Sequence, residues 1–373
     1  MNQYKDKTVL VIGHTGFKGS WLSLWLDMLG AKVVGISNEI PSDPANFDVC
    51  GLTDFISDNR LDIKNLDSLS ATIKAVQPDF IFHLAAQSLV IPSYQDPVNT
   101  FLTNAIGTTH VLESVRLLKK DVVLVMITSD KVYDNLEWSW GYRETDRLGG
   151  KDPYSASKGM AEIVIRSYQE SFFNKKEEKV YLGIARAGNV IGGGDWALNR
   201  IIPDCVRAWS KNETVDIRNP NATRPWQHVL EPLSGYLHLG SELLENEKVN
   251  GEAYNFGPSA DQNFSVKELI TEMSKSWADV SWNDTSDSSN NINEAGLLKL
   301  NCDKALADLS WSPNLTFGET VKMTANWYEA FYARTKNDKE ISMKEFTQQQ
   351  IRDYKDLGKE RSKSWSDTLN LMD

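Results

Sequence analysis

The chain has 373 residues, 41% of them hydrophobic and 24% charged, which is the composition of an ordinary globular protein. Its net charge of −11 argues against a general affinity for nucleic acid or for an anionic membrane, because both favour a basic surface. No apolar run approaches the roughly 18 residues of a membrane-spanning helix. The three cysteines and five histidines are scattered without metal-ligand spacing, so we expect no metal and no disulfide framework. We expect a cytoplasmic protein.

Short apolar runs alternate with helical patterns through the first half of the chain. The runs are TVLVIG (8–13), KVVGIS (32–37), FIFHLAA (80–86), VVLVMITS (122–129) and VYLGIARAGNV (180–190). Runs that are apolar on both faces and separated by helices predict a parallel sheet covered on both sides. The predicted fold class is therefore α/β, a doubly wound parallel sheet of the Rossmann type, with right-handed connections.

The domain organisation changes after about residue 190, where the alternation ends. A single core stops growing at roughly 250–300 residues, so a second, smaller substrate-binding lobe is expected. YNFG (254–257) again has the pattern of a strand end. We predict a discontinuous dinucleotide-binding domain (1–190 and 226–260), a nucleotide-sugar-binding domain (191–225 and 261–332), and a charged helical C-terminal extension (333–373). For that extension we expect a peripheral helix and a loose tail without chemistry.

The first predicted strand ends in a glycine-rich turn, GHTGFKGSW, which contains Gly13, Gly16 and Gly19. Glycine allows the tight turn and lets backbone N–H groups approach an anion, so a pyrophosphate can lie at the N-terminus of the following helix. Because a strand precedes this turn and a helical pattern follows it, the motif predicts a dinucleotide site.

The end of the second strand bears on the choice between NAD and NADP. An acid usually binds the adenosine ribose of NAD there. This chain instead has Ser37 and Asn38, followed by Glu39, and no arginine that would favour a 2′-phosphate. We expect NAD, and NADP stays open. Asp62 and Ile63 are placed to meet adenine, although Asp62 could equally cap the next helix. The predicted cofactor set also includes Thr15, Phe17, Leu84, Ala85, Ala86 and Asn104.

Tyr154 and Lys158 are four residues apart in a helical pattern and so share one helix face. An ammonium about 5 Å from the phenol contributes roughly 3 kcal/mol at an effective dielectric of about 20, which lowers a tyrosine pKa by about two units. We predict that Tyr154 is a base for a substrate hydroxyl and that Lys158 also holds the nicotinamide ribose. The alternative is an exposed pair that arose by chance.

The segment TSDKVY (128–133) follows the fourth predicted strand, at the sheet edge where ligands of such folds bind. Ser129 can hydrogen-bond the same hydroxyl as Tyr154. Asp130 and Lys131 exceed what alcohol oxidation needs. A protonated Asp130 can donate to a leaving hydroxyl, and a neutral Lys131 can remove a carbon-bound proton that a neighbouring ketone has made acidic. The alternative is a surface ion pair at a strand end.

Several long motifs resemble one family. They are GHTGFKGSWLSLWL, FHLAAQSLV, TSDKVYDN, GGKDPYSASKG, RAGNVIGGGDWA, IRNPNATRPWQHVLEPLSGY and NEAGLLKLNCDKA, which together span about residues 5–330. The chain resembles the extended short-chain dehydrogenase/reductases, and among them the CDP-glucose branch of the nucleotide-sugar 4,6-dehydratases. The pair Asp130-Lys131 is similar to that of this branch, whereas most dTDP and GDP enzymes carry Asp-Glu.

The resemblance implies a cycle without net redox change. Tyr154, assisted by Ser129, takes the 4-hydroxyl proton of CDP-glucose while NAD takes the C4 hydride. Lys131 removes the C5 proton, Asp130 protonates the leaving C6 hydroxyl, and the hydride returns to C6. The product would be CDP-4-keto-6-deoxyglucose, a precursor of deoxysugars for polysaccharides. A 4-epimerase or 4-ketoreductase would not need Asp130 beside Lys131, and a nucleotide sensor would not need an intact catalytic set.

The phosphates of a nucleotide sugar favour arginine forks or amide donors. The resemblance implies that Asn189 and Arg224 meet the pyrophosphate and that Arg200 or Asp195 lies near the nucleoside. Arg218 is a further candidate, and the alternative for each of the three arginines is an ordinary surface side chain.

The last expectations concern two further substrate contacts and the assembly of subunits. Gln87 and Ser88 could contact sugar hydroxyls, although Ser88 could instead cap a helix. Helical stretches at 99–118 and 155–172 resemble the dimer-forming pair of the family, so we expect a homodimer or homotetramer. Their apolar faces could equally pack on their own sheet.

Overall fold

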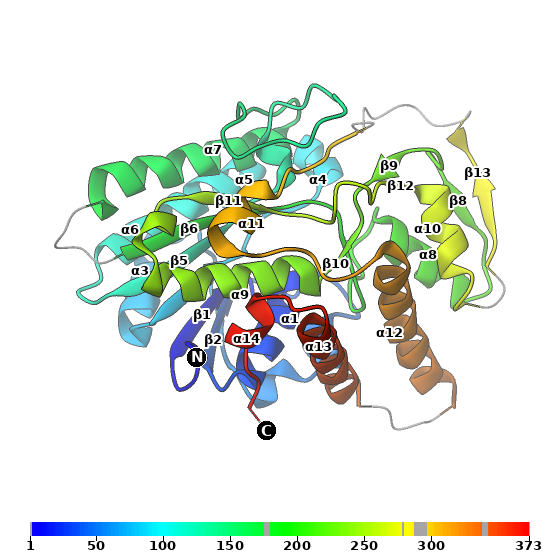
Figure 1. The fold of residues 1–373 in the computed structure, drawn as a ribbon, viewed down its shortest axis with the longest axis horizontal. Helices are drawn as coiled ribbons and strands as arrows, with labels where there is room; N and C mark the ends of the chain where they lie inside the picture. The colour runs from blue at the N-terminus through cyan, green and yellow to red at the C-terminus, as the bar shows by residue number, and fades with distance from the viewer. Residues whose placement is uncertain (1, 175–179, 278–279, 287–296, 338–341, 373) are drawn as a thin grey trace.

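A seven-stranded parallel sheet forms the centre of this computed structural model, which describes residues 2–174, 180–277, 280–286, 297–337 and 342–372 (Figure 1). The strand order is β11-β6-β5-β4-β1-β2-β3. The strands are β1 (Thr8–Ile12), β2 (Lys32–Ser37), β3 (Ser57–Arg60), β4 (Phe80–His83), β5 (Val122–Ile127), β6 (Val180–Ala187) and β11 (Ala253–Phe256). The predicted doubly wound α/β fold is confirmed.

Helices cover both faces of the sheet because its strands are apolar on both sides. In β1, Leu10 and Ile12 pack in one core with α3, α6 and α7, while Val9 and Val11 pack in a second core with α1 and α9. Successive side chains of a strand point to opposite faces, which explains this division. The helices are α1 (Phe17–Met28), α3 (Leu66–Val76), α6 (Gly107–Arg116), α7 (Pro153–Tyr168) and α9 (Leu230–Glu245).

Shorter helices connect the strands. α2 (Asn46–Val49) follows β2, and α4 (Val90–Gln95) and α5 (Pro97–Phe101) follow β4. A π-helical segment, η2 (Leu102–Ile106), joins α5 to α6, so one helical stretch runs through residues 97–116.

A smaller group of elements lies at the right of Figure 1. It contains α8 (Ile201–Trp209), α10 (Val266–Met273), and short strand pairs between β8 (Val215–Ile217) and β13 (Trp282–Asp284) and between β9 (Thr223–Arg224) and β12 (Phe264–Ser265). β7 (Val190–Ile191) pairs with β10 (Gln227–His228), and α11 (Asp303–Leu309) and α12 (Phe317–Asn337) follow. The chain returns to the main sheet at β11, as YNFG indicated, where Ala253 pairs with Ile184.

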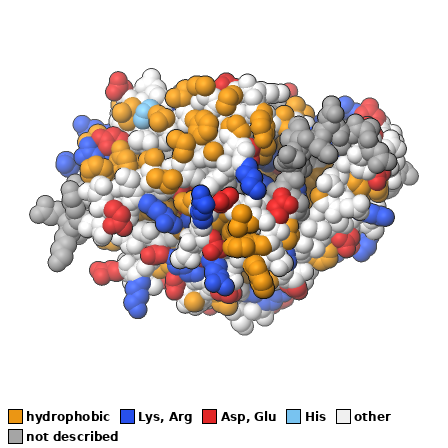
Figure 2. Space-filling view, turned by 90° about the horizontal axis from the view of Figure 1, so that it is seen from above, with side chains coloured by type: hydrophobic (Ala, Val, Ile, Leu, Met, Phe, Trp, Pro, Cys, Tyr) orange, Lys and Arg blue, Asp and Glu red, His pale blue; other side chains and the backbone are white. Residues whose placement is uncertain are grey.

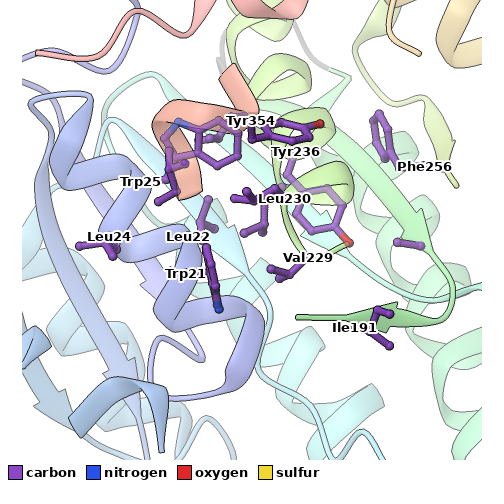
Figure 3. Close-up of a cluster of buried hydrophobic side chains, with 14 of the residues drawn as sticks. Trp21, Leu22, Leu24, Trp25, Ile191, Val229, Leu230, Tyr236, Phe256 and Tyr354 are labelled. Carbon is purple, nitrogen blue, oxygen red and sulfur yellow. The ribbon is translucent and has the colours of Figure 1, made fainter. Parts of the chain in front are cut away.

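The C-terminal extension is packed onto the sheet domain, so the expectation of a loose tail is wrong. It forms α13 (Met343–Glu360) and α14 (Trp365–Thr368). Tyr354 stacks on Trp365 with ring centroids 4.9 Å apart, and its hydroxyl donates to Glu231 Oε2 over 2.9 Å. Figure 3 shows Tyr354 beside Trp25 of α1. Both rings of the stacked pair are fully buried, and burial of such rings contributes strongly to docking a helix.

Candidate active site

A cavity of about 1280 Å³ lies at the carboxyl ends of β1, β2, β4, β5 and β6 and extends toward α8 and β8. Ligand pockets usually measure about 300–1,000 Å³, so this cavity has room for a dinucleotide together with a second ligand. Every residue of the predicted catalytic, cofactor and substrate sets lines it except Asn104. The carboxyl edge of a parallel sheet is where ligands of this fold class bind.

The glycine-rich turn has the form that a pyrophosphate cradle requires. Gly13 has φ +98°, and a Cβ there would lie 2.7 Å from the backbone N of Ala85. A Cβ on Gly19 would lie 2.0 Å from the carbonyl O of Gly13, so the turn and α1 approach too closely for a side chain. Gly16 is the N-cap of α1, without a side-chain cap or an acid in the first turn, so this helix end suits an anion. The residues present therefore fit a dinucleotide.

Two polar groups near the end of β2 are held by local hydrogen bonds. The Thr15 and Ser37 hydroxyls lie 2.7 Å apart, and Thr15 Oγ1 also donates to the Glu39 carbonyl. Asp62 does not cap α3, because Asn65 does so by accepting from Ser68 N over 3.1 Å. Asp62 instead accepts from Lys64 N and lines the cavity beside Ile63.

Asn104 is the one member of the predicted cofactor set that does not line the cavity. It is 1% exposed, and its amide accepts from Gln87 N and donates to Gln87 O and Ser157 Oγ. It therefore holds the loop after β4 and does not face the cavity. The Gln87 amide is used inside the same loop, where it accepts from Leu89 N over 2.6 Å.

Ser88 does not cap a helix. The N-cap of α4 is Leu89, and Ser88 Oγ instead accepts from Arg200 Nη2 over 3.3 Å. Arg200 Nη1 also donates to Asp195 Oδ2 over 2.8 Å, and this carboxylate raises the pKa of the guanidinium. The Tyr328 hydroxyl of α12 donates to the Asp195 carbonyl, which fixes the backbone that carries the Asp195 side chain. Asn189, Arg218 and Arg224 also line the cavity.

Tyr154 and Lys158 lie on the first turns of α7, which begins at Pro153, directly after the N-cap Asp152. Burial raises the pKa of Tyr154 to about 12, against the opposing hydrogen bond from Ser129. Burial lowers the pKa of Lys158 to about 8, against the opposing charge of Glu162. The predicted lowering of the tyrosine pKa is therefore wrong in sign, because desolvation of the phenolate outweighs the hydrogen bond from Ser129 and the charge of Arg200. Both groups are buried, so the alternative of an exposed pair is also wrong.

Ser129, Asp130 and Lys131 form the start of a short 3-10 turn that follows β5. Ser129 Oγ donates to Asp130 Oδ1 over 2.9 Å and accepts from Lys131 N over 3.2 Å. Asp130 is 4% exposed, which does not fit a surface ion pair. Asp130, Lys131 and Tyr154 line the same cavity.

Comparison with known proteins identifies the family. A family model described as GDP-mannose 4,6 dehydratase matches residues 10–324. The chain belongs to this family. CDP-glucose 4,6-dehydratase of Salmonella typhimurium is 45% identical over 334 residues, which cover 88% of this chain and 92% of that protein. UDP-glucose 4-epimerase of Mycoplasma pneumoniae is 24% identical over 90% of this chain and 100% of that protein.

Solved structures of related enzymes share the fold. DesIV, a dTDP-glucose 4,6-dehydratase from Streptomyces venezuelae, superposes with a TM-score of 0.72 at 22% identity, over 86% of this chain and 97% of that one. UDP-glucuronic acid 4-epimerase from Bacillus cereus gives 0.73 at 22% identity, over 87% and 100%. These structures share the fold, and the family match together with the 45% identity to the Salmonella typhimurium enzyme confirms the expected class, a nucleotide-sugar 4,6-dehydratase. No helix in the described part of the chain has the length and apolarity needed to cross a membrane.

The sequence analysis missed Lys18, which lies in the glycine-rich motif, on the first turn of α1 of this dehydratase. Lys18 lines the cavity, and its Nζ lies 5.9 Å from the ring centroid of Tyr236. Burial lowers the pKa of Lys18 to about 8; the charge of Arg200 lowers it further, and that of Asp130 opposes the shift. The available signal was a lysine between Gly16 and Gly19, in a motif expected to approach a phosphate group.

Proposed function

We propose that this dehydratase converts CDP-glucose to CDP-4-keto-6-deoxyglucose with NAD. The observation that carries the proposal is that Asp130 and Lys131 line the same cavity as Ser129 and Tyr154. Oxidation at C4 needs a base and a hydride acceptor, whereas expulsion of the C6 hydroxyl needs an acid and a second base as well. The CDP-glucose enzyme from Salmonella typhimurium, at 45% identity, supports the choice of nucleotide.

The residues of the chain divide the proton transfers between them. Tyr154 takes the proton of the 4-hydroxyl, which Ser129 orients by hydrogen bonding. Lys131 removes the C5 proton once C4 is a ketone, and Asp130 gives its proton to the C6 oxygen, which leaves as water. Lys131 then returns a proton to C5. A nicotinamide supplies the hydride acceptor for C4 and the hydride donor for C6, and Lys158 is placed to hold its ribose.

NAD is favoured over NADP by the charges near the adenosine end. Glu39 and Asp62 both line the cavity there, and the Ser37 hydroxyl is hydrogen-bonded to the Thr15 hydroxyl. A 2′-phosphate would lie close to the Glu39 carboxylate, and like charges at close range repel by several kcal/mol at an effective dielectric of about 20. The carboxylate of Asp62 is paired with Lys64 Nζ over 3.4 Å, so it contributes less. The site therefore suits an unphosphorylated ribose.

The nucleotide sugar would be held by Asn189, at the end of the cofactor domain, and by arginines of the smaller lobe. Asn189, Arg218 and Arg224 supply donors for a pyrophosphate, and Arg200 is fixed by Asp195 at the opening of α8. We assign residues 1–190 and 226–260 to the cofactor domain and 191–225 and 261–332 to this lobe.

We also propose a homodimer formed through α7 and the stretch 97–116, which pack against each other. Val98 is 67% exposed and Ile163 60%, and their exposed neighbours are Tyr94, Leu102, Ile106 and Met160. Figure 2, which views the molecule from above, shows hydrophobic side chains gathered on that face. An apolar patch of this kind is typical of a protein interface.

Incubation with CDP-glucose in heavy water tests the function. The product expected is a 4-keto-6-deoxy sugar with one solvent deuterium at C5, formed without accumulation of reduced cofactor. UDP-, dTDP- and GDP-glucose in parallel reactions test the nucleotide. A C4 epimer as the sole product would show that the protein acts as an epimerase.

A further inference from the structure

One buried ion pair holds the Ser129–Asp130–Lys131 segment from both ends. The pair joins Arg186 of β6 to Glu162 of α7, and both side chains are fully buried. Arg186 Nε donates to Glu162 Oε1 over 2.7 Å, and Arg186 Nη2 donates to Glu162 Oε2. The contact is thus bidentate, with two hydrogen bonds that fix both side chains.

The residues on either side of the segment are bonded to this pair. Thr128, directly before Ser129, donates its hydroxyl hydrogen to Glu162 Oε1 over 2.7 Å. Tyr133, two residues after Lys131, accepts from Arg186 Nη1 over 2.7 Å and donates to Asn255 Oδ1 of β11 over 2.8 Å. The segment therefore spans two anchor points on one rigid group.

The same pair is tied to the helix that carries the phenol. Glu162 lies one turn after Lys158 and two turns after Tyr154 on α7. The ion pair therefore connects α7, β6 and the two ends of the segment at a common point.

Stability alone does not account for this arrangement. Replacing a buried ion pair with apolar residues of similar volume is often neutral or stabilising, because the desolvation cost can exceed the attraction between the charges. Apolar side chains could not receive or donate the directed hydrogen bonds of Thr128 and Tyr133. What the ion pair adds is a fixed direction for those two side chains, and hence for the residues between them.

We propose that Glu162 and Arg186 are positioning residues that hold Asp130 and Lys131 in place relative to Tyr154. The inference rests on the proposed function, which gives Asp130 and Lys131 their parts in the elimination. Tyr154 is fixed by α7 itself, so loosening an anchor displaces Asp130 and Lys131 more than Tyr154. The elimination step is therefore more sensitive to these anchors than the C4 oxidation.

Two substitutions test the inference, Tyr133→Phe and Thr128→Val, each of which removes one hydroxyl and keeps the shape of the side chain. The rate of C4 oxidation is followed by absorbance at 340 nm in a single turnover, and elimination by deuterium incorporation at C5. We expect elimination to fall about tenfold in each variant while oxidation stays within about twofold, since a loss of about 1.4 kcal/mol in one step gives this ratio. Reduced cofactor then accumulates transiently.

Tyr4→Phe is the matched control, because Tyr4 is also fully buried and its hydroxyl donates to the Leu237 carbonyl. It should lower thermal stability without changing the ratio of the two steps. If Tyr133→Phe does not fold, Thr128→Val decides. An unchanged ratio of the two rates, whether both fall equally or neither falls, would overturn the inference. A wild-type enzyme that shows no elimination would instead refute the proposed function, and this inference with it.

Discussion

Gly188 sets the position of Asp130, and its replacement by alanine should impair elimination selectively. A Cβ on Gly188 would lie 2.8 Å from Asp130 Oδ2 and 3.3 Å from its Cγ. The φ of Gly188 is not in the left-handed region, so alanine meets no backbone strain and the effect arises at the carboxylate. To reach a van der Waals separation of about 3.5 Å, the carboxylate oxygen must retreat by roughly 0.7 Å. Its other oxygen is hydrogen-bonded to Ser129, and the side chain is buried, so this movement displaces the acid from its place.

The magnitude follows from the sensitivity of catalysis to placement. A misplacement of about 1 Å can cost about 100-fold, so we predict a 10- to 100-fold slower elimination in Gly188→Ala, with C4 oxidation much less affected. The assay compares deuterium incorporation at C5 with absorbance at 340 nm. Gly257→Ala is the control, because a Cβ there meets Cys302 and Leu300 at an ordinary 3.5 Å. Elimination at the wild-type rate in Gly188→Ala would refute the assignment of Asp130 as the acid.

Three further predictions address the second base, the phenol and the assembly. Lys131→Ala should retain C4 oxidation and lose C5 deuterium incorporation by about 100-fold or more, the contribution of a general base; an unimpaired overall rate would remove Lys131 from the mechanism. Burial raises the pKa of Tyr154 to about 12, so at any pH well below 12 the fraction of phenolate rises tenfold with each unit of rising pH. Single-turnover C4 oxidation should therefore become faster from about pH 6 to 8; a flat profile would contradict this. Ile163→Glu should convert the dimer to a monomer in light scattering, because it places a charge in the apolar patch, whereas Leu306→Glu on α11 should not; an unchanged mass for Ile163→Glu would place the interface elsewhere.

The apolar runs predicted the central strands well, because residues buried on both faces leave a continuous signal. β3 was missed because its sequence is SDNR and it lies at the edge of the sheet, bonded on one side to β2. The packing of the extension was missed for a related reason. Tyr354 and Trp365 are separated by charged residues, and no local pattern shows that their rings stack.

The cavity was predictable because parallel strands bring their carboxyl ends to one edge, so motifs far apart in sequence had to converge there. The pKa of Tyr154 was not predictable, because the spacing from Tyr154 to Lys158 shows that the two side chains share a helix face but does not show that both are buried. The connection from Thr128 through Glu162 and Arg186 to Tyr133 joins three separate places in the chain, and a single sequence contains no signal for such a contact.

The transfer of hydrogen from C4 to C6 is the central claim, and CDP-glucose deuterated at C4 tests it most directly. The account predicts a 4-keto-6-deoxy product that carries this deuterium at C6, seen by NMR or mass spectrometry. Deuterium that stays at C4 in an epimerised sugar, or that is lost to another acceptor, would contradict it.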